Sequence, residues 1–578
     1  MKRSKLIELP TSRTMVDLFK GYNHNLRIGE GEFYDMTNLS ADNYPVLSPR
    51  KKRGVYATPS DPKGLVAKDA LCYVDGSDFV INEYRVAMGL SDIEPKTLIS
   101  MGAYVIIMPD KKYINTADHT DKGDIEASVT TSSTVTFELC KLDGEGYDSV
   151  VTQSTAPENP LNLDLWIDTS SVPHTLRQYS EANDMWVSIA TTYIKISAVG
   201  IGTPFSEGDG VTISGINAAG LSDLNNTMIV WGKGDNYIIV TGILDMVTTQ
   251  EEPITVQRRM PIMDFVIESG NRLWGCRYGT DINGNVVNEL YASKLGDFKN
   301  WHCFAGISTD SYAVTVGSDG QFTGAISYLD YPLFFKENCL HKVYGKFPAE
   351  FRVQDTTCRG VQKGCDRSMA VVNEILYYKA RSGVCVYDGS LPSEISSAFG
   401  DVNYHNAVAG SIGNKYYISM SDDDEQWHMF VFDTVKGMWH REDNTQAVCF
   451  CNCRGDLYYI DYYTNQIKTV RGTGDTEKDP IKWEAVTGIM GTDSPDKKYI
   501  SRIDVRMMLQ VGARVTFMAE YDSSGAWEHL YTADGVNLKT FAVPVRTKRC
   551  DHMRLKIVGT GDAKIFSICK TIEQGSDR

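Results

Sequence analysis

Three groups of side chains in the sequence are of the types that bind metal ions. Cys449, Cys451 and Cys453 alternate along a predicted strand, so their thiols share one face. Paired zinc ligands usually lie about two to four residues apart, and small buried side chains explain the alternation equally well. Segments 281–285 and 422–424 offer the oxygen ligands of calcium, but they are typical of a hairpin turn and a solvated loop. We expect no metal ion at any of them.

The sequence contains no familiar catalytic motif. It has no Gly-x-Ser-x-Gly elbow, no His-Glu-x-x-His pair and no glycine-rich phosphate loop, and only 10 of its 578 residues are histidine. Segment 293–301, with Ser293, Asp297 and Trp301, resembles the Asp-box turn of sialidase-type propellers. That turn is structural even in the enzymes. We therefore expect no enzymatic activity, no catalytic residue and no cofactor.

The first 60 residues combine a basic cluster with aromatic side chains. The cluster is the only compact positive run in the chain, formed by Arg50, Lys51, Lys52 and Arg53. It is either a solvated segment or a contact with an acidic neighbouring subunit. Four of the aromatic residues that precede it are candidate anchors, namely Phe19, Tyr22, Phe33 and Tyr44. Because such rings are unfavourable in water, we predict that these eight residues are assembly contacts with a neighbouring subunit.

The net charge of the chain limits the kinds of partner that it can bind. The chain has 58 Lys and Arg against 74 Asp and Glu, a formal net charge of −16. A protein that wraps nucleic acid needs clustered basic residues, whereas an acidic wall lets double-stranded DNA pass without sticking. The basic start has no apolar run behind it, and no stretch reaches the roughly 18 apolar residues of a membrane helix. We expect no signal peptide and no membrane-spanning segment.

The pattern of apolar residues predicts an all-β chain. Short runs of Val, Ile, Tyr, Phe and Thr alternate with turns such as Asp75-Gly76 and Asp388-Gly389. Strands of one style begin at Leu71, Tyr104, Leu273, Leu333, Leu376, Tyr416 and Leu457. The last four begin about 40 residues apart, which is close to the length of a four-stranded propeller blade. The repeat predicts a β-propeller of about six to eight blades.

Five parts follow from these patterns. The long gap between the strands at Tyr104 and Leu273 requires an inserted domain. After residue 475 the strands alternate more regularly, which is typical of a β-sandwich. The parts are an extended N-terminal arm (residues 1–60), a first group of blades (61–120), one or two inserted β-domains (121–255), a second group of blades (256–475) and a C-terminal β-sandwich (476–578).

Stretches at both ends of the chain resemble a known family. Segment 19–50 includes Phe-Lys-Gly-Tyr-Asn-His-Asn and Asp-Met-Thr-Asn-Leu, and it ends in Tyr-Pro-Val-Leu-Ser-Pro-Arg. It resembles the opening of propeller-containing tail and neck proteins of tailed bacteriophages. Segments 541–546, 554–561 and 572–578 are similar to their closing β-sandwich. The insertion at 121–255 departs from the pattern of that family.

This resemblance implies a structural protein of the phage tail, in the hub or nozzle ring below the portal or neck. Such a protein helps retain packaged DNA and forms the channel for genome ejection. The implied partners are the portal or adaptor, tail fibres, neighbouring tail proteins and further copies in a homo-hexameric ring. It would be made in the host bacterial cytoplasm and located in the virion tail. The alternative is a carbohydrate-binding or sialidase-like propeller acting on host surface glycans, with Trp166 and Trp186 stacking on sugars unless they are core residues.

Overall fold

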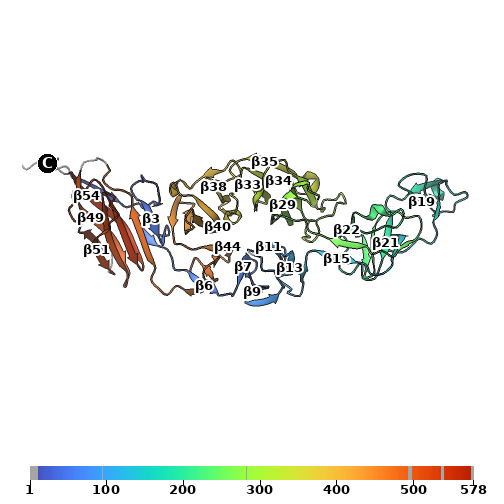
Figure 1. Ribbon diagram of the computed structural model, residues 1–578, viewed down its shortest axis with the longest axis horizontal. Coiled ribbons are helices and arrows are strands. Elements are labelled where there is room, and N and C mark those ends of the chain that lie inside the picture. The colour runs from blue at the N-terminus through green and yellow to red at the C-terminus, as the bar shows by residue number, and fades with distance from the viewer. Residues whose placement is uncertain (1–10, 94, 282, 493–496, 536–538, 575–578) are drawn as a thin grey trace, which may run out of the picture. The chain divides into compact units, whose positions relative to one another are not determined.

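The computed structural model describes residues 11–574 except 94, 282, 493–496 and 536–538 (Figure 1). These residues form 54 strands and five short 3-10 helices, and none of them lies in an α-helix. The all-β prediction is confirmed. Within the described ranges, no helix has the length and apolar character needed to cross a membrane.

The chain divides into two compact units. The first comprises Met1–Leu98, Phe334–Leu340 and Thr356–Arg578, and the second comprises Ile99–Leu333 and His341–Asp355.

Seven sheets of similar construction recur along the chain, with their strands in chain order. They run from β7 (Pro62–Ala67) to β10 (Tyr84–Ala87), β11 (Thr97–Met101) to β14 (Lys122–Asp124), β28 (Phe265–Ser269) to β31 (Tyr312–Thr315), β32 (Phe322–Tyr328) to β35 (Arg352–Thr357), β36 (Ala370–Val372) to β39 (Ser393–Glu394), β40 (Tyr404–Ile412) to β43 (Met438–Arg441), and β44 (Ala447–Cys453) to β46 (Ile467–Thr469). The last sheet continues into β6 (Gly54–Ala57) and β47 (Asp475–Thr476). Each of the seven strands singled out in the sequence repeat is the second strand of one of these sheets.

In the first unit these second strands are buried on both faces. Every residue of β45 (Asp456–Asp461) is buried, and so are all but the two end residues of β41 (Lys415–Asp422). A strand with two buried faces lies in a sheet that is covered on both sides. One apolar cluster joins Met429 to Leu457 of the next sheet, and another joins Leu71 to Ile460.

The N-terminal residues pair with the C-terminal strands. β1 (Thr11–Val16) is antiparallel to β54 (Ala563–Gln574), and β3 (Glu32–Thr37) is antiparallel to β48 (Lys482–Thr487). Figure 1 shows β3, in blue, beside the orange and red strands. The sheets have the orders β1-β54-β49-β52 and β2-β3-β48-β53-β50-β51. Their other strands are β2 (Gly21–Tyr22), β49 (Lys498–Leu509), β50 (Arg514–Tyr521), β51 (Glu528–Asp534), β52 (Lys539–Val543) and β53 (Met553–Thr560). Much of the expected arm therefore completes the C-terminal sheets.

The insertion belongs to the second unit. Its first strand β15 (Ala127–Thr130) pairs with its last strand β27 (Thr255–Arg258), so the chain enters and leaves at one edge. The insertion has three sheets, the first of which contains β15 and β27, and two of the sheets enclose a core that includes Phe137, Ile194 and Val211. The third sheet is formed by β17 (Val151–Gln153), β18 (Leu165–Asp168), β19 (Thr175–Ser180) and β20 (Met185–Ser188).

Candidate functional site

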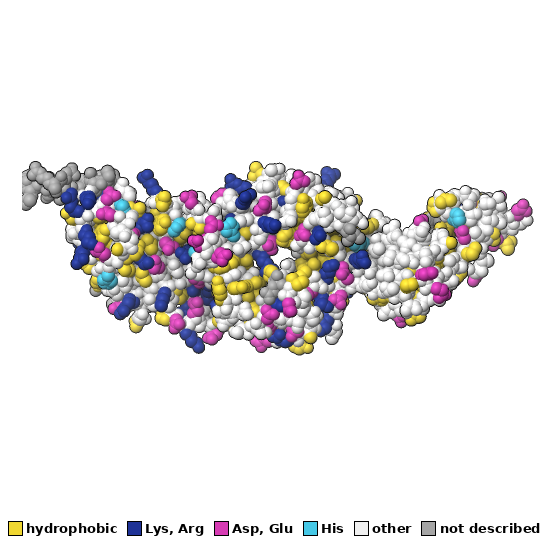
Figure 2. Space-filling model, viewed as in Figure 1, with side chains coloured by type: hydrophobic (Ala, Val, Ile, Leu, Met, Phe, Trp, Pro, Cys, Tyr) yellow, Lys and Arg dark blue, Asp and Glu magenta, His cyan; other side chains and the backbone are white. Residues whose placement is uncertain are grey.

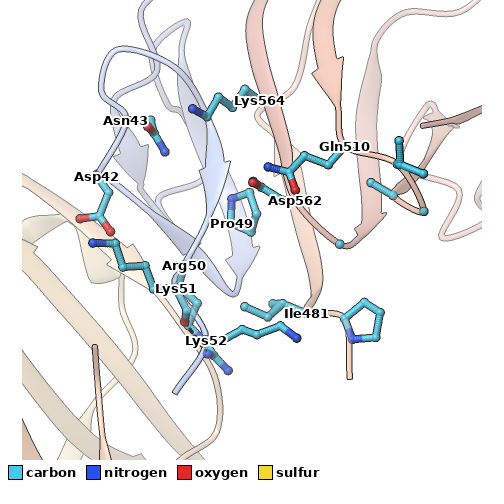
Figure 3. Close-up of a pocket in the computed structure, with 15 residues that line it drawn as sticks. Asp42, Asn43, Pro49, Arg50, Lys51, Lys52, Ile481, Gln510, Asp562 and Lys564 are labelled. Atoms are coloured by element: carbon cyan, nitrogen blue, oxygen red, sulfur yellow. Dashed lines mark hydrogen bonds between the residues drawn. The ribbon is translucent and has the colours of Figure 1, made fainter. Parts of the chain in front are cut away.

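Three residues of the predicted basic cluster, Arg50, Lys51 and Lys52, line a cavity of the first unit. This cavity of 680 Å³ is bounded by residues 42–43, 49–52, 480–481, 510–513, 561–562 and 564. A second cavity of 390 Å³ shares Asp42, Arg50 and Lys51 with it. In Figure 3 Lys51 extends toward Asp42, and Lys564 approaches from a C-terminal strand. Together the two cavities form the basic cleft.

Positive charge dominates the basic cleft. Its cationic residues are Arg50, Lys51, Lys52, Lys415, Lys436, Arg471 and Lys564. Its acidic residues are Asp42, Asp433, Glu442 and Asp562. The lining residues alone, seven cations and four carboxylates, carry a net charge of +3 in a chain whose net charge is −16. Such a local reversal of sign attracts anionic groups.

Two arginines of the cluster form ion pairs within the chain. Arg53 lies 2.8 Å from Glu442 and 2.8 Å from Asp443. Arg50 lies 3.1 Å from Glu477 and 3.6 Å from Asp443. Burial opposes the charged form of Asp443, but Arg53 and Arg50 hold the pKa of its carboxyl below the ordinary value. These arginines fix the segment to its own chain.

The remaining cationic side chains of the basic cleft differ in whether they already have a partner within the chain. Lys52 donates to the backbone carbonyl of Glu477 at 2.8 Å, and Lys415 forms an ion pair with Asp42. Burial raises the pKa of Asp42, but Lys415 outweighs it and the pKa lies below the ordinary value. The side chains of three cations form no hydrogen bond or ion pair with any described residue, namely Lys51, Arg471 and Lys564. A ligand could bind them without breaking an existing pair.

The four predicted aromatic contacts lie in different surroundings. Phe19 stacks on Phe33 with ring centroids 5.8 Å apart, and Tyr22 is equally buried. Tyr44 is 38% exposed, with the Nζ of Lys436 lying 5.8 Å from its ring centroid. The premise that all four rings need a neighbouring subunit is wrong for the first three, because they are buried within this chain. Their assembly role stays a prediction, and Tyr44 beside the basic cleft is the aromatic side chain that a partner can reach.

The alternating cysteines share a face, as the sequence predicted. Cys449, Cys451 and Cys453 of β44 pack into the apolar cluster of Leu71 and Ile460. Burial raises the pKa of Cys449 to about 11, which keeps its thiol protonated. Among the residues with described positions, no group of three or more His, Cys, Asp and Glu could hold a metal ion. The three thiols act as small apolar side chains.

Both acidic segments form turns. Asp281 accepts hydrogen bonds from the amides of Asn283 and Asn285 at 2.8 Å each. Asp422 accepts one from Nε2 of His428 at 2.7 Å, across the turn between β41 and β42 (Trp427–Asp433). The expectation of a hairpin and a loop is confirmed.

Segment 293–301 forms a turn and also holds the insertion. Ser293 and Asp297 accept hydrogen bonds from backbone amides at 3.0 and 2.9 Å. Asn300 donates to Asp209 at 2.8 Å, and Asp209 is paired with Arg258 at 2.5 Å, with all three side chains buried. No sequence motif indicated this hydrogen-bond network, because 91 positions separate Asn300 from Asp209.

The structure also assembles an arrangement that no motif indicated. Oγ of Ser318 lies 2.8 Å from Nε2 of His341, and Nδ1 of His341 lies 2.5 Å from Asp355. Serine hydrolases use the same Ser–His–Asp arrangement for catalysis, and their histidine passes a proton to the leaving group. Here the His341 side chain has no exposed surface, whereas Asp355 is 51% exposed. A fully buried imidazole cannot reach a leaving group, so the geometry favours a structural role.

The two tryptophans of the carbohydrate alternative share a face of the sheet β17–β20. Trp166 and Trp186 have ring centroids 5.4 Å apart, and Tyr179 flanks Trp186 at 5.4 Å. Trp166 is buried, with the guanidinium of Arg177 5.7 Å from its ring centroid. Trp166 is a core residue, and half-buried Trp186 is the ring that a sugar could contact.

No family model and no curated protein matches this chain. Among solved structures, the Trypanosoma rangeli sialidase in complex with sialic acid is 9% identical, with a TM-score of 0.25 over 99% of this chain and 97% of that one. An exo-β-1,3-galactanase from Phanerochaete chrysosporium with galactose is 9% identical, with a TM-score of 0.20 over 53% and 94%. A Bacillus thuringiensis Cry1Da tryptic core variant is 9% identical, with a TM-score of 0.13 over 53% and 52%. Likenesses this weak carry no argument about activity.

Proposed function

We propose that the seven similar sheets are the blades of one seven-bladed β-propeller. The packing of successive sheets supports this reading: Phe335 of β33 (Tyr331–Lys336) contacts Tyr378 of β37 (Ile375–Ala380), with centroids 5.2 Å apart. β6 precedes the first sheet in the chain and yet pairs with β46 of the last sheet. Such a strand exchange joins the first and last blades of a propeller and protects its edges.

The two sheets of the terminal regions are proposed to form a β-sandwich. Residues of β53 alternate strictly between buried and half-buried, which is typical of a sheet with one face on a core. In this reading the N-terminal strands are part of the sandwich and not an arm.

The chain is proposed to be a structural subunit of a bacteriophage tail, in a homo-hexameric hub or nozzle ring below the portal or neck. In this role it helps retain packaged DNA, its acidic surface lets the genome pass, and it meets the portal or adaptor, tail fibres or neighbouring tail proteins. Parts of the two end regions that resemble such proteins lie in one sheet, where β48 stands between β3 and β53. The observation that carries the proposal is the basic cleft, an open cationic surface on an acidic chain, since it suits docking to an acidic protein better than catalysis.

The test is the position of the chain in purified phage particles. Cryo-electron microscopy of tails, with mass spectrometry of the same particles, is expected to find the chain at a fixed copy number in a ring near the neck. Particles of normal composition that lack the chain would contradict the proposal.

The second candidate is a glycan-binding protein, favoured by Trp186 and Tyr179 on one sheet face. A Trp186→Ala variant that loses binding to host-surface polysaccharide, with its fold unchanged, would support this candidate. Equal binding by the variant and the natural chain, or no binding by either, speaks against it.

A further inference from the structure

The cationic side chains of the basic cleft come from independently fixed segments. Lys51 follows Arg50, which is held by ion pairs to Glu477 and Asp443. Lys564 lies on β54, and Arg471 follows β46. Because strand pairing or ion pairs hold these segments, the three cations are in place before any ligand binds. A preformed site loses little entropy on binding.

A matching group of acidic side chains lies elsewhere in the same unit. The turn between β41 and β42 carries four consecutive acidic residues, from Asp422 to Glu425. Asp422 and Asp423 are engaged by His428 and His405. Asp424 and Glu425 are exposed, and their side chains form no hydrogen bond or ion pair with the described part of the chain. The tip of this hairpin therefore presents two unpaired carboxylates.

The turn cannot reach the basic cleft of its own chain. β41 begins at Lys415, which lines the cleft, and ends seven residues later at Asp422. At about 3.3 Å per residue, the strand separates the two sites by roughly 23 Å. A strand buried between neighbouring sheets does not bend back on itself, so any contact between the two sites joins different molecules.

We propose that the basic cleft binds the acidic turn, residues 422–425, of a second copy of this chain. The two surfaces differ, so the interface is heterologous, and repetition around an axis closes a ring. This inference rests on the proposed function for its ring, and it identifies the surfaces by which ring subunits meet. Asp424 and Glu425 supply carboxylates to Lys51, Lys564 and Arg471.

The insertion is a less suitable occupant, although it is more acidic overall. Residues 127–258 contain 16 Asp and Glu against 5 Lys and Arg, a net charge of −11. On the face drawn in Figure 2, the insertion shows few Lys or Arg side chains. Its carboxylates are spread over three sheets, and several are already paired, as Asp168 is with Arg177. The turn concentrates its charge at one tip.

The test is a charge swap in the full chain, read by sedimentation velocity at low and high salt. The natural chain is expected to self-associate, and to do so less at high salt because screening weakens charge pairs. The cleft variant K51E/K564E and the turn variant D424K/E425K are each expected to associate about tenfold more weakly. Combining all four substitutions is expected to restore association, because the charges are then exchanged.

The matched control is K346E/K363E, which makes the same change in net charge at two exposed lysines outside the cleft. It is expected to associate like the natural chain, and circular dichroism verifies that every variant is folded. A natural chain that stays monomeric, a control as weak as the cleft variant, or a combined variant without recovery overturns the inference. These association measurements do not require phage particles. If the chain were absent from phage particles, the proposed function would be contradicted, but the contact between copies of the chain would not.

Discussion

The guanidinium of Arg53 lies 2.8 Å from the carboxylate of Glu442, and their side chains are only 5% and 6% exposed. The pair joins positions 389 residues apart. It fixes the segment before β6 to the end of the sheet β40–β43, and Asp443 and Tyr459 complete the surroundings of Arg53. The pair therefore positions the neighbouring Arg50 and Lys51 at the basic cleft.

Replacing Arg53 by Met is expected to lower the free energy of unfolding by about 3–5 kcal/mol, because Glu442 is left charged and buried without its partner. Urea denaturation measures the change. Arg514→Met is the control, since the Arg514–Asp534 pair is exposed, and its expected cost is about 0–1 kcal/mol. Equal losses for both variants would show that the buried pair is unimportant.

Deleting residues 1–50 is expected to unfold the C-terminal sheets, because β54 and β48 lose their partners β1 and β3. Point variants separate the effects: Phe33→Ala, at 1% exposure, is expected to cost about 3–5 kcal/mol, and Tyr44→Ala less than about 1 kcal/mol. A soluble truncated chain with native circular dichroism contradicts the expectation.

Asn300→Leu is expected to loosen the base of the insertion, since buried Asp209 loses a hydrogen bond worth about 1–3 kcal/mol. Hydrogen exchange at β22 (Gly210–Ser214) should become at least about tenfold faster. Asn183→Leu, at an exposed turn of the same insertion, is the control. Unchanged exchange in the Asn300 variant would remove its anchoring role.

His440 makes the fold acid-sensitive. Burial, together with nearby Lys415, lowers its pKa to about 3, whereas an unfolded histidine titrates near about 6.5. Between these values only the unfolded state binds the proton, so stability falls as the pH falls below about 6.5. Between pH 7 and pH 5 the loss is about 2 kcal/mol. His440→Gln is expected to be less stable at pH 7 but to lose about 2 kcal/mol less on acidification, as urea denaturation at pH 7 and pH 5 measures.

Ser318 is expected to resist phosphonylation, because the His341 imidazole is fully buried. Incubation with a fluorophosphonate probe should leave the chain unlabelled, while a known serine hydrolase in the same tube is labelled. Labelling that disappears in Ser318→Ala would contradict both the structural role of this network and the expectation of no enzymatic activity.

The sequence by itself determined the strands and their repeat. All seven repeated strands became second strands, because a strand covered on both faces needs an unbroken apolar run, as Leu457 to Ile460 provides. The shared face of Cys449, Cys451 and Cys453 followed from the two-residue period of a strand. These properties depend on neighbours in the chain, so the sequence displays them directly.

Only the tertiary structure decided which distant segments meet. Backbone hydrogen bonds pair Thr11–Val16 with the last strand, and such bonds carry no side-chain signature. The cations Lys415, Arg471 and Lys564 look unrelated in the sequence, and they join Lys51 only because separate sheets bring their ends to one place. A local pattern reports burial and period, whereas a site built from remote segments depends on sheet order, which no local pattern encodes.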